Sequence, residues 1–152
     1  MNLQARIQAF TQLGKSLNID FYKKHEEIIK QASIKNAWFT IENIKTALQA
    51  WKAQLTDEML TAWLTPYKLS DSKDIKNILV IMAGNIPLVG FHDFLTVLIS
   101  GNKVVIKMST NDNVILPLVI DELISIEPIF KERISFIEEV KNKKFDGVIA
   151  TG

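Results

Sequence analysis

The chain has 152 residues, of which 47% are hydrophobic and 23% charged, so it can bury one sizeable core and is too short for two full domains. Its 18 basic and 17 acidic residues give a net charge of +1, so no strong electrostatic field argues for nucleic acid or an anionic membrane as a partner, and we expect no nucleic-acid partner. The absence of cysteine excludes disulfides, a cysteine-ligated metal site and a thiol nucleophile within the chain, and two histidines argue against a histidine-rich metal site.

Apolar residues in the first 66 positions recur at intervals of about 3.6 and predict four helices. Their apolar faces are Leu3, Ile7, Phe10, Leu13 and Leu17; Phe21, Ile28, Ile29 and Ala32; Ile41, Ile44, Leu48, Trp51 and Leu55; and Leu60, Trp63 and Leu64. We expect Thr40 and Thr56 to cap the third and fourth helices, because a threonine hydroxyl accepts a hydrogen bond from the free N–H groups of a helix start. Pro66 ends the fourth helix.

A polar link over 67–76 is followed by short runs rich in Ile and Val. The runs that predict strands are Ile78–Ala83, Lys103–Met108, Ile134–Val140 and Gly147–Ala150. Helical segments separate the first three, and crossovers of this length suit parallel pairing. Because the runs are continuously apolar, we expect the strands to be covered on both faces. The predicted organisation is a helical region with its linker over 1–76 and a parallel-sheet α/β half-domain over 77–152.

Turn residues mark the ends of the predicted helices in this half. We expect Pro87 in the first turn of the helix after the first strand, and Gly101 at its C′ position. A second helix, with Leu116, Val119, Ile120 and Leu123, begins after Asn113. The basic run Lys141–Lys144 is predicted to be a solvated loop.

The most apolar stretch, Ile86–Ser100, is too short to span a bilayer and is interrupted by His92 and Asp93. It predicts a buried helix. The amino terminus lacks the apolar core of a signal peptide, so we expect a cytoplasmic protein without membrane insertion.

Asn85 lies between a predicted strand end and a predicted helix start. An amide in this position can donate a hydrogen bond to an oxyanion that forms during acyl or aldehyde chemistry. It can equally cap the helix or tolerate an unusual backbone angle. Both interpretations are open from the residues alone.

Lys107, Ser109 and Thr110 follow the second predicted strand, at the edge where open α/β sheets bind nucleotides. An ammonium and two hydroxyls can bind the ribose hydroxyls or 2′-phosphate of a cofactor. The alternative for Lys107 is an ordinary solvated lysine. Thr151-Gly152 can open a loop of small residues that a pyrophosphate approaches, or can simply be a tail.

Other polar and aromatic residues point less clearly to chemistry. His92 and Asp93 are interpreted as a structural or partly exposed pair, because no nucleophile lies nearby in the sequence. Trp38, Trp51 and Trp63 match the helical period and are expected in the core rather than in a ligand platform. The chain has neither a Walker lysine motif nor a G-x-G-x-x-G fingerprint, and we expect no metal site.

Three motifs occur in a fixed order: Gly84-Asn85-Ile86-Pro87, then Gly101-Asn102-Lys103-Val104-Val105-Ile106-Lys107-Met108-Ser109, then Gly147-Val148-Ile149-Ala150-Thr151-Gly152. The set resembles the aldehyde dehydrogenase superfamily, whose motifs read approximately W-N-F-P, G-N-x-V-V-x-K-P-S-E and F-T-G-S. The opening, with Ala37-Trp38-Phe39-Thr40 and Leu64-Thr65-Pro66-Tyr67, is similar to the acyl-CoA reductases related to the fatty-acid reductase of bacterial luminescence. The resemblance covers essentially the whole chain and implies a Rossmann-like fold of aldehyde dehydrogenase type.

The resemblance implies that Asn85 is the oxyanion-hole amide and that Lys107 and Ser109 approach the adenosine ribose. It also implies that Thr151-Gly152 open the loop at the cofactor pyrophosphate. Gly84 replaces a bulky residue of the family pattern and Met108 replaces a proline. Thr110 replaces the acidic residue that commonly binds the ribose 2′-hydroxyl, so Lys107 with Thr110 favours NADPH over NADH.

The mechanism implied by the resemblance is reduction of a fatty acyl thioester to an aldehyde through a cysteine acyl-enzyme. That cysteine would lie outside this chain, so we expect the 152 residues to be the inactive amino-terminal part of an NADPH-dependent acyl-CoA reductase. An unfinished sheet exposes strand edges, which predicts a homo-oligomer or pairing with the missing carboxyl-terminal segment. The alternatives are a non-catalytic binding or assembly module and another NAD(P)-linked reductase, such as a semialdehyde or glutamyl-phosphate reductase.

Overall fold

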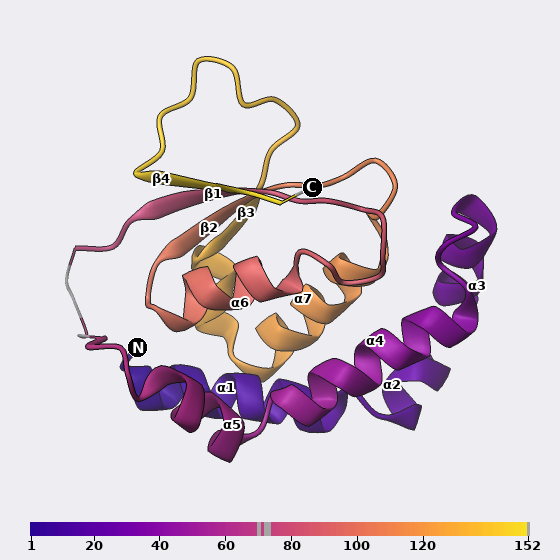
Figure 1. The fold of residues 1–152 in the computed structure, drawn as a ribbon, viewed down its shortest axis with the longest axis horizontal. Helices are drawn as coiled ribbons and strands as arrows, with labels where there is room; N and C mark the ends of the chain where they lie inside the picture. Colours follow the sequence, from indigo (N-terminus) through magenta and orange to yellow (C-terminus); the bar gives the residue numbers. More distant parts are fainter. Residues whose placement is uncertain (70, 72–73, 152) are drawn as a thin grey trace.

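The computed structural model describes residues 1–69, 71 and 74–151. It begins with a run of helices and continues with alternating strands and helices (Figure 1). The helices are α1 (Leu3–Ser16), α2 (Ile19–Lys24), α3 (Glu26–Lys35), α4 (Ile41–Gln54), α5 (Asp57–Leu64), α6 (Phe91–Ile99), α7 (Ile115–Ile126) and the short 3-10 helix η1 (Pro128–Glu132). The strands are β1 (Asn77–Ile81), β2 (Lys103–Lys107), β3 (Ile134–Phe136) and β4 (Gly147–Ala150).

Helices α4 and α5 begin where their predicted capping residues place them. The Thr40 hydroxyl accepts a hydrogen bond from the N–H of Asn43, and the Thr56 hydroxyl accepts one from the N–H of Met59. The helix predicted around Phe21 and Ala32 is instead two helices, α2 and α3, which meet at His25. The backbone of His25 leaves the helical region, with φ −110° and ψ 13°, so the chain turns there.

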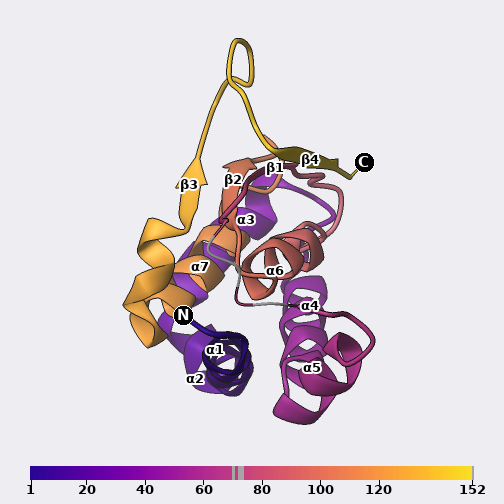
Figure 2. The ribbon, with the colours of Figure 1, turned by 90° about the vertical axis from the view of Figure 1, so that its left-hand side faces the viewer.

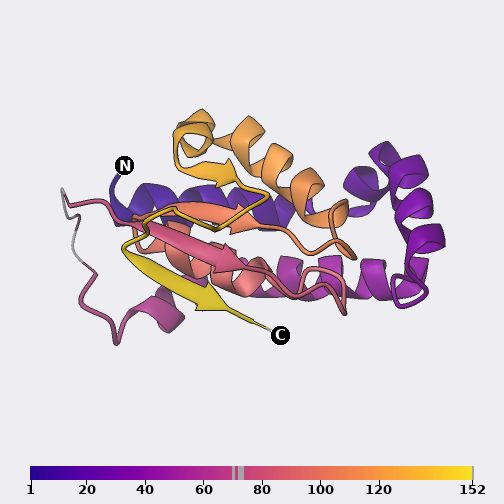
Figure 3. The same ribbon diagram turned by 90° about the horizontal axis from the view of Figure 1, so that it is seen from above.

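The four strands form one parallel sheet in the order β3-β2-β1-β4, which confirms the predicted parallel pairing (Figure 3). From β1 the chain passes through α6 to β2 and through α7 to β3, always in the same direction across the sheet. It then returns through the loop over 137–146 and adds β4 on the far side of β1. The strand order therefore reverses direction between β1 and β4.

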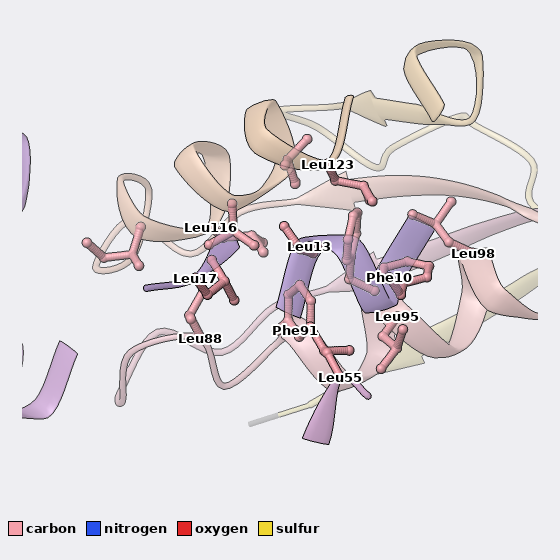
Figure 4. Packing of buried hydrophobic residues seen from close by; sticks show 14 of the residues in the cluster. Phe10, Leu13, Leu17, Leu55, Leu88, Phe91, Leu95, Leu98, Leu116 and Leu123 are labelled. Carbon is pink, nitrogen blue, oxygen red and sulfur yellow. The ribbon is translucent and has the colours of Figure 1, made fainter. Parts of the chain in front are cut away.

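Helices α6 and α7 lie against one face of the sheet, and α1, α4 and α5 form a further layer beneath them (Figure 2). The fully buried Phe10 and Leu13 of α1 meet Phe91 of α6 and Leu123 of α7 in one continuous core (Figure 4). The described helices leave the opposite face of the sheet uncovered, and Val148 on that face is 59% exposed. Leu79 of β1, in register with Val148, is nevertheless fully buried, so the expectation of strands covered on both faces is met at the centre of β1 and not at β4.

Several predicted boundaries are corrected by the structure. Strand β1 ends at Ile81 and β3 at Phe136, earlier than their apolar runs. Pro87 lies in a turn before α6 rather than in its first turn, because the N–H of Phe91 bonds the carbonyl of Leu88 and the helix starts only there. Gly101, with φ +91°, occupies the C′ position as predicted.

Candidate functional site

The ends of three neighbouring strands meet at one edge of the sheet. Ile81 at the end of β1 is in register with Lys107 of β2 and with Ala150 of β4. The backbone continues this pairing, since the N–H of Thr151 donates to the carbonyl of Ile81 at 3.3 Å. This edge includes the β1/β4 boundary where the strand order reverses, which is the position at which open α/β sheets bind ligands.

Gly84, which follows β1, lies directly against the loop that follows β2. A Cβ atom at Gly84 would lie 2.2 Å from the Ser109 hydroxyl oxygen and 3.1 Å from the backbone nitrogen of Asp112. The side chain of Ser109 therefore occupies the space that a bulky residue before Asn85 would need. This close approach explains why a glycine stands at position 84.

Asn85 is exposed, and within the described residues its side-chain amide makes no hydrogen bond. Its loop is nevertheless fixed a few residues later by Leu88, which is 2% exposed and has φ +60°, a backbone conformation that leucine rarely adopts. The amide is thus carried on an anchored loop and has both N–H donors available to a ligand.

The three polar residues after β2 differ in their surroundings. Lys107 is half-buried and lies on the sheet face away from α6 and α7, because the alternate residue Ile106 points into the core. The Ser109 hydroxyl accepts a hydrogen bond from the N–H of Asn111 at 3.2 Å and keeps its own proton for another partner. Thr110 is exposed. The structure brings these residues to the same edge as Asn85, although no hydrogen bond joins Lys107 to Asn85 among the described residues.

Thr151 meets a residue that the sequence did not connect with it. Its hydroxyl donates to a carboxylate oxygen of Asp93, in the first turn of α6. The Asp93 side chain is only 18% exposed, and Nδ1 of the neighbouring His92 lies 3.8 Å from its other oxygen. Asp93 stands in the first turn of α6, where an acidic residue is common, so the sequence alone carries no signal of its contact with Thr151. Gly152 lies outside the described residues.

Asp112 is a second residue that the sequence analysis missed. It is 6% exposed, and its Oδ1 atom has no hydrogen-bond partner among the described residues. Burial raises the pKa of this carboxyl above its usual value, and the backbone amides of Leu88, Ile115 and Val114 oppose the rise. Its position before α7 is ordinary for a helix start, so the sequence gives no signal of this burial.

The helical region reaches the same edge through α3. The side-chain amide of Asn36 donates to the backbone carbonyl of Asn111 at 3.2 Å, and the neighbouring Phe39 is buried. Trp38, which was expected in the core, is 72% exposed. The loop after β2 thus packs closely against Gly84 on one side and is bonded to the end of α3 on the other.

The described residues contain neither a cluster of metal-ligating side chains nor a membrane-spanning helix. In 1–69, 71 and 74–151, no three His, Asp or Glu side chains lie close enough together to bind a metal ion. No helix in the same ranges combines the length and the apolar character needed to cross a membrane.

Comparison with known proteins gives a match at the level of a family model. No curated protein and no solved structure matches the sequence with significance. A family model described as acyl-CoA reductase (LuxC) matches residues 1–152. This match confirms the resemblance drawn from the three ordered motifs and from the helical opening. The chain belongs to the acyl-CoA reductase (LuxC) family.

Proposed function

We propose that this chain provides the cofactor-binding edge and the oxyanion donor of an enzyme that reduces a fatty acyl thioester to an aldehyde with NADPH. Its family implies acyl-CoA reduction and, in general, a nicotinamide cofactor. The observation that supports the proposal most is the parallel alignment of β1, β2 and β4, after which Asn85, Ser109 and Thr151 follow at one edge.

Asn85 is proposed as the group that stabilises negative charge on the thioester oxygen. A hydrogen-bond donor aimed at an oxygen that becomes negative lowers the barrier, because the interaction is stronger in the transition state than with the neutral carbonyl. The amide is exposed and unpaired within the described residues, and Leu88 anchors its loop in the core. These features suit a donor that needs little rearrangement before the reaction.

The groups at the end of β2 fit a phosphorylated ribose. Lys107 offers an ammonium, and Ser109 and Thr110 offer hydroxyls, while Gly84 leaves room for this loop beside β1. No carboxylate occupies position 110, and Asp112 on the same loop is buried. An added 2′-phosphate would therefore meet a positive group instead of a negative one at this edge, which favours NADPH. Bound there, the cofactor would supply the hydride for reduction.

The thiol that accepts the acyl group has to come from elsewhere, because these 152 residues contain no cysteine. We therefore propose that the chain is the amino-terminal part of a cytoplasmic reductase and is inactive alone. Residues 1–76 form its helical region and linker, and 77–152 form the first part of its nucleotide-binding domain. A homo-oligomer or a carboxyl-terminal segment completes the sheet.

The test is thioester-dependent oxidation of NADPH by the complete protein that contains this sequence. We expect Asn85→Ala to lower kcat by about 10²–10³-fold, the usual loss for one oxyanion donor. Asn113→Ala removes another exposed amide from the loop before α7 and should leave kcat unchanged. A complete protein that binds acyl thioesters without oxidising NADPH would instead support the binding-module alternative.

A further inference from the structure

The amino-terminal helices leave a cleft beside the candidate site. It has a volume of about 490 Å³ and lies between α4, α5 and α6. Its walls are formed mainly by Trp51, Met59, Leu60, Trp63, His92 and Leu95. No lysine, arginine, aspartate or glutamate is among the described residues that line it. Nothing in the proposed function so far uses this cleft.

The walls suit an apolar ligand. The ring of Trp51 packs edge-on against Phe91, with 4.6 Å between the centroids, and Trp63 lies 5.8 Å from the ring of His92. Met59, which is 45% exposed, adds a flexible side chain at the same cleft. A volume of this size lies in the range of small-molecule sites. A strongly polar ligand would lose its hydrogen bonds with water on entering such a cleft.

The cleft starts within one helical turn of the sheet edge. His92 lines it, and the next residue, Asp93, accepts the hydrogen bond from Thr151 at the end of β4. Asn85 belongs to the segment that leads directly into α6. A ligand with a polar head at the sheet edge can therefore continue along the first turn of α6 into the cleft.

From this juxtaposition we propose that the cleft between α4, α5 and α6 binds the aliphatic chain of the acyl thioester. The inference rests on the proposed function for the identity of the ligand, and it adds a site for the part of the substrate that does not react. An unbranched alkyl chain has no polar group to desolvate, so its burial against these walls is favourable in proportion to its length.

Tryptophan fluorescence tests the site without any reductase activity. The chain has three tryptophans; Trp51 and Trp63 line the cleft, and the exposed Trp38 is replaced in a Trp38→Phe background. In the 152-residue chain, straight-chain fatty acids brominated along the chain should quench the remaining fluorescence and reach saturation. Their affinity should rise about fourfold for each added methylene until the cleft is full.

Two neighbouring exposed positions on α5 provide matched variants. Ala62→Phe places a ring in the cleft, whereas Thr61→Phe places the same ring on a residue that does not line it. We expect Ala62→Phe to weaken binding about tenfold or more, as displacing two methylenes would, and Thr61→Phe to have little effect. Absence of saturable quenching, or equal losses in both variants, would overturn the inference.

The outcome also separates this inference from the proposed function. Saturable, length-dependent quenching with no NADPH oxidation by the complete protein would keep the cleft as an aliphatic-chain site and reject the reductase. NADPH oxidation without quenching would keep the reductase and reject the cleft. Competition between NADPH and the brominated acid for the same quenching signal would assign the cleft to the cofactor and would also reject the inference.

Discussion

Gly84 and Ser109 touch where the loops after β1 and β2 meet. The φ angle of Gly84 is not in the left-handed region, so the glycine is needed for space alone. We predict that Gly84→Ala destabilises the fold by about 1–3 kcal/mol, because the new methyl group would lie 2.6 Å from the Cβ of Ser109. Urea unfolding followed by circular dichroism measures this loss.

A double-mutant cycle with Ser109→Gly shows whether crowding against Ser109 causes the loss of stability in Gly84→Ala. Removing the Ser109 side chain frees the space into which the new methyl group projects, so Gly84→Ala should cost much less in that background. An equal loss of unfolding free energy with and without the Ser109 side chain would show that Gly84→Ala strains another part of the loop.

We propose that Thr110 favours NADPH over NADH. A carboxylate here would accept a bond from a ribose 2′-hydroxyl and repel a 2′-phosphate. We predict that Thr110→Glu weakens NADPH binding to the 152-residue chain by about tenfold or more and leaves or improves NADH binding. Titration with each cofactor, followed by nicotinamide fluorescence, measures both. Thr61→Glu adds the same charge on exposed α5 and should leave the ratio unchanged.

Asp112 is expected to make stability depend on pH. Its pKa is raised from 3.8 by burial, so the folded state holds this proton more tightly than the unfolded state. The stability it contributes is fully present below pH 3.8 and is lost as the pH rises through its folded pKa. Asp112→Asn cannot ionise and should therefore gain stability relative to the wild type as the pH rises above this value.

Urea unfolding of both proteins across the acid range checks this prediction, because the other titrating groups cancel in the difference between their unfolding free energies. A difference that stays flat would show that the amides of Leu88, Val114 and Ile115 offset the effect of burial. A difference that runs the other way would show that these amides stabilise the charged carboxylate.

At the scale of elements, the carboxyl-terminal end of α6 is closed by Gly101 in the left-handed conformation and is bonded by two arginine side chains. The N–H groups of Gly101 and Asn102 bond the carbonyls of Leu98 and Val97, the pattern that closes a helix with a left-handed C′ residue. The Arg6 side chain donates to the carbonyl of Ile99 at 2.8 Å. Arg133 donates to the carbonyl of Gly101 at 2.9 Å. These bonds connect α1 and the segment after η1 to the same helix end.

Two substitutions at Gly101 distinguish the energetic cost of backbone strain from the cost of crowding against Arg6. A non-glycine residue in the left-handed region costs roughly 1–2 kcal/mol, and asparagine tolerates it better than alanine. Both Gly101→Ala and Gly101→Asn place a Cβ 3.3 Å from the Arg6 guanidinium. We therefore predict that alanine lowers the unfolding free energy more than asparagine does in urea titrations. Equal losses would show that contact with Arg6, not φ, sets the cost.

Elements were predictable where their signals are local. Thr40 and Thr56 cap helices through bonds three residues away, and Gly101 ends α6 by its own φ, so the sequence alone identified them. The break at His25 has no proline or glycine to mark it. The fixed φ of Pro87 is compatible both with the first turn of a helix and with a turn before it. Leu88 packs into the core after Pro87, and α6 begins only at Phe91.

The candidate site likewise has features that the sequence predicts and features that depend on tertiary packing. Parallel pairing follows from strand composition and crossover length, so the sequence could place Asn85, Lys107 and Thr151 at one edge. The contact between Thr151 and Asp93 joins residues 58 positions apart and depends on how α6 packs. The apolar cleft likewise needs three helices in their final places. Trp51 and Trp63 matched the helical period, and only packing shows that they line a cleft.

At the scale of the whole molecule, the helical region supports both ends of the α/β unit. At one end, Asn36 at the end of α3 bonds the loop after β2, which carries the proposed cofactor groups. At the other end, Arg6 of α1 bonds the last turn of α6. The same region supplies two walls of the apolar cleft. The helices thus contribute to the proposed site as well as to the core.

The outer strands of the sheet predict self-association. Strand β4 pairs only with β1 among the described strands, so its other edge presents free backbone groups, and Val148 is 59% exposed. Proteins commonly pair or cover such edges. We predict that the chain associates reversibly with concentration, and that Val148→Lys shifts it towards the monomer in size-exclusion chromatography with light scattering. Ser135→Lys adds the same charge at the opposite edge, in β3, on the same face of the sheet.

The comparison between the two lysine variants identifies the edge that pairs. If copies pair through β4, Val148→Lys should abolish association at concentrations where Ser135→Lys still associates. Equal shifts in both variants would attribute the effect to net charge, because each adds one positive charge to a chain that carries +1. A wild-type chain that remains monomeric at every concentration would contradict pairing through either edge.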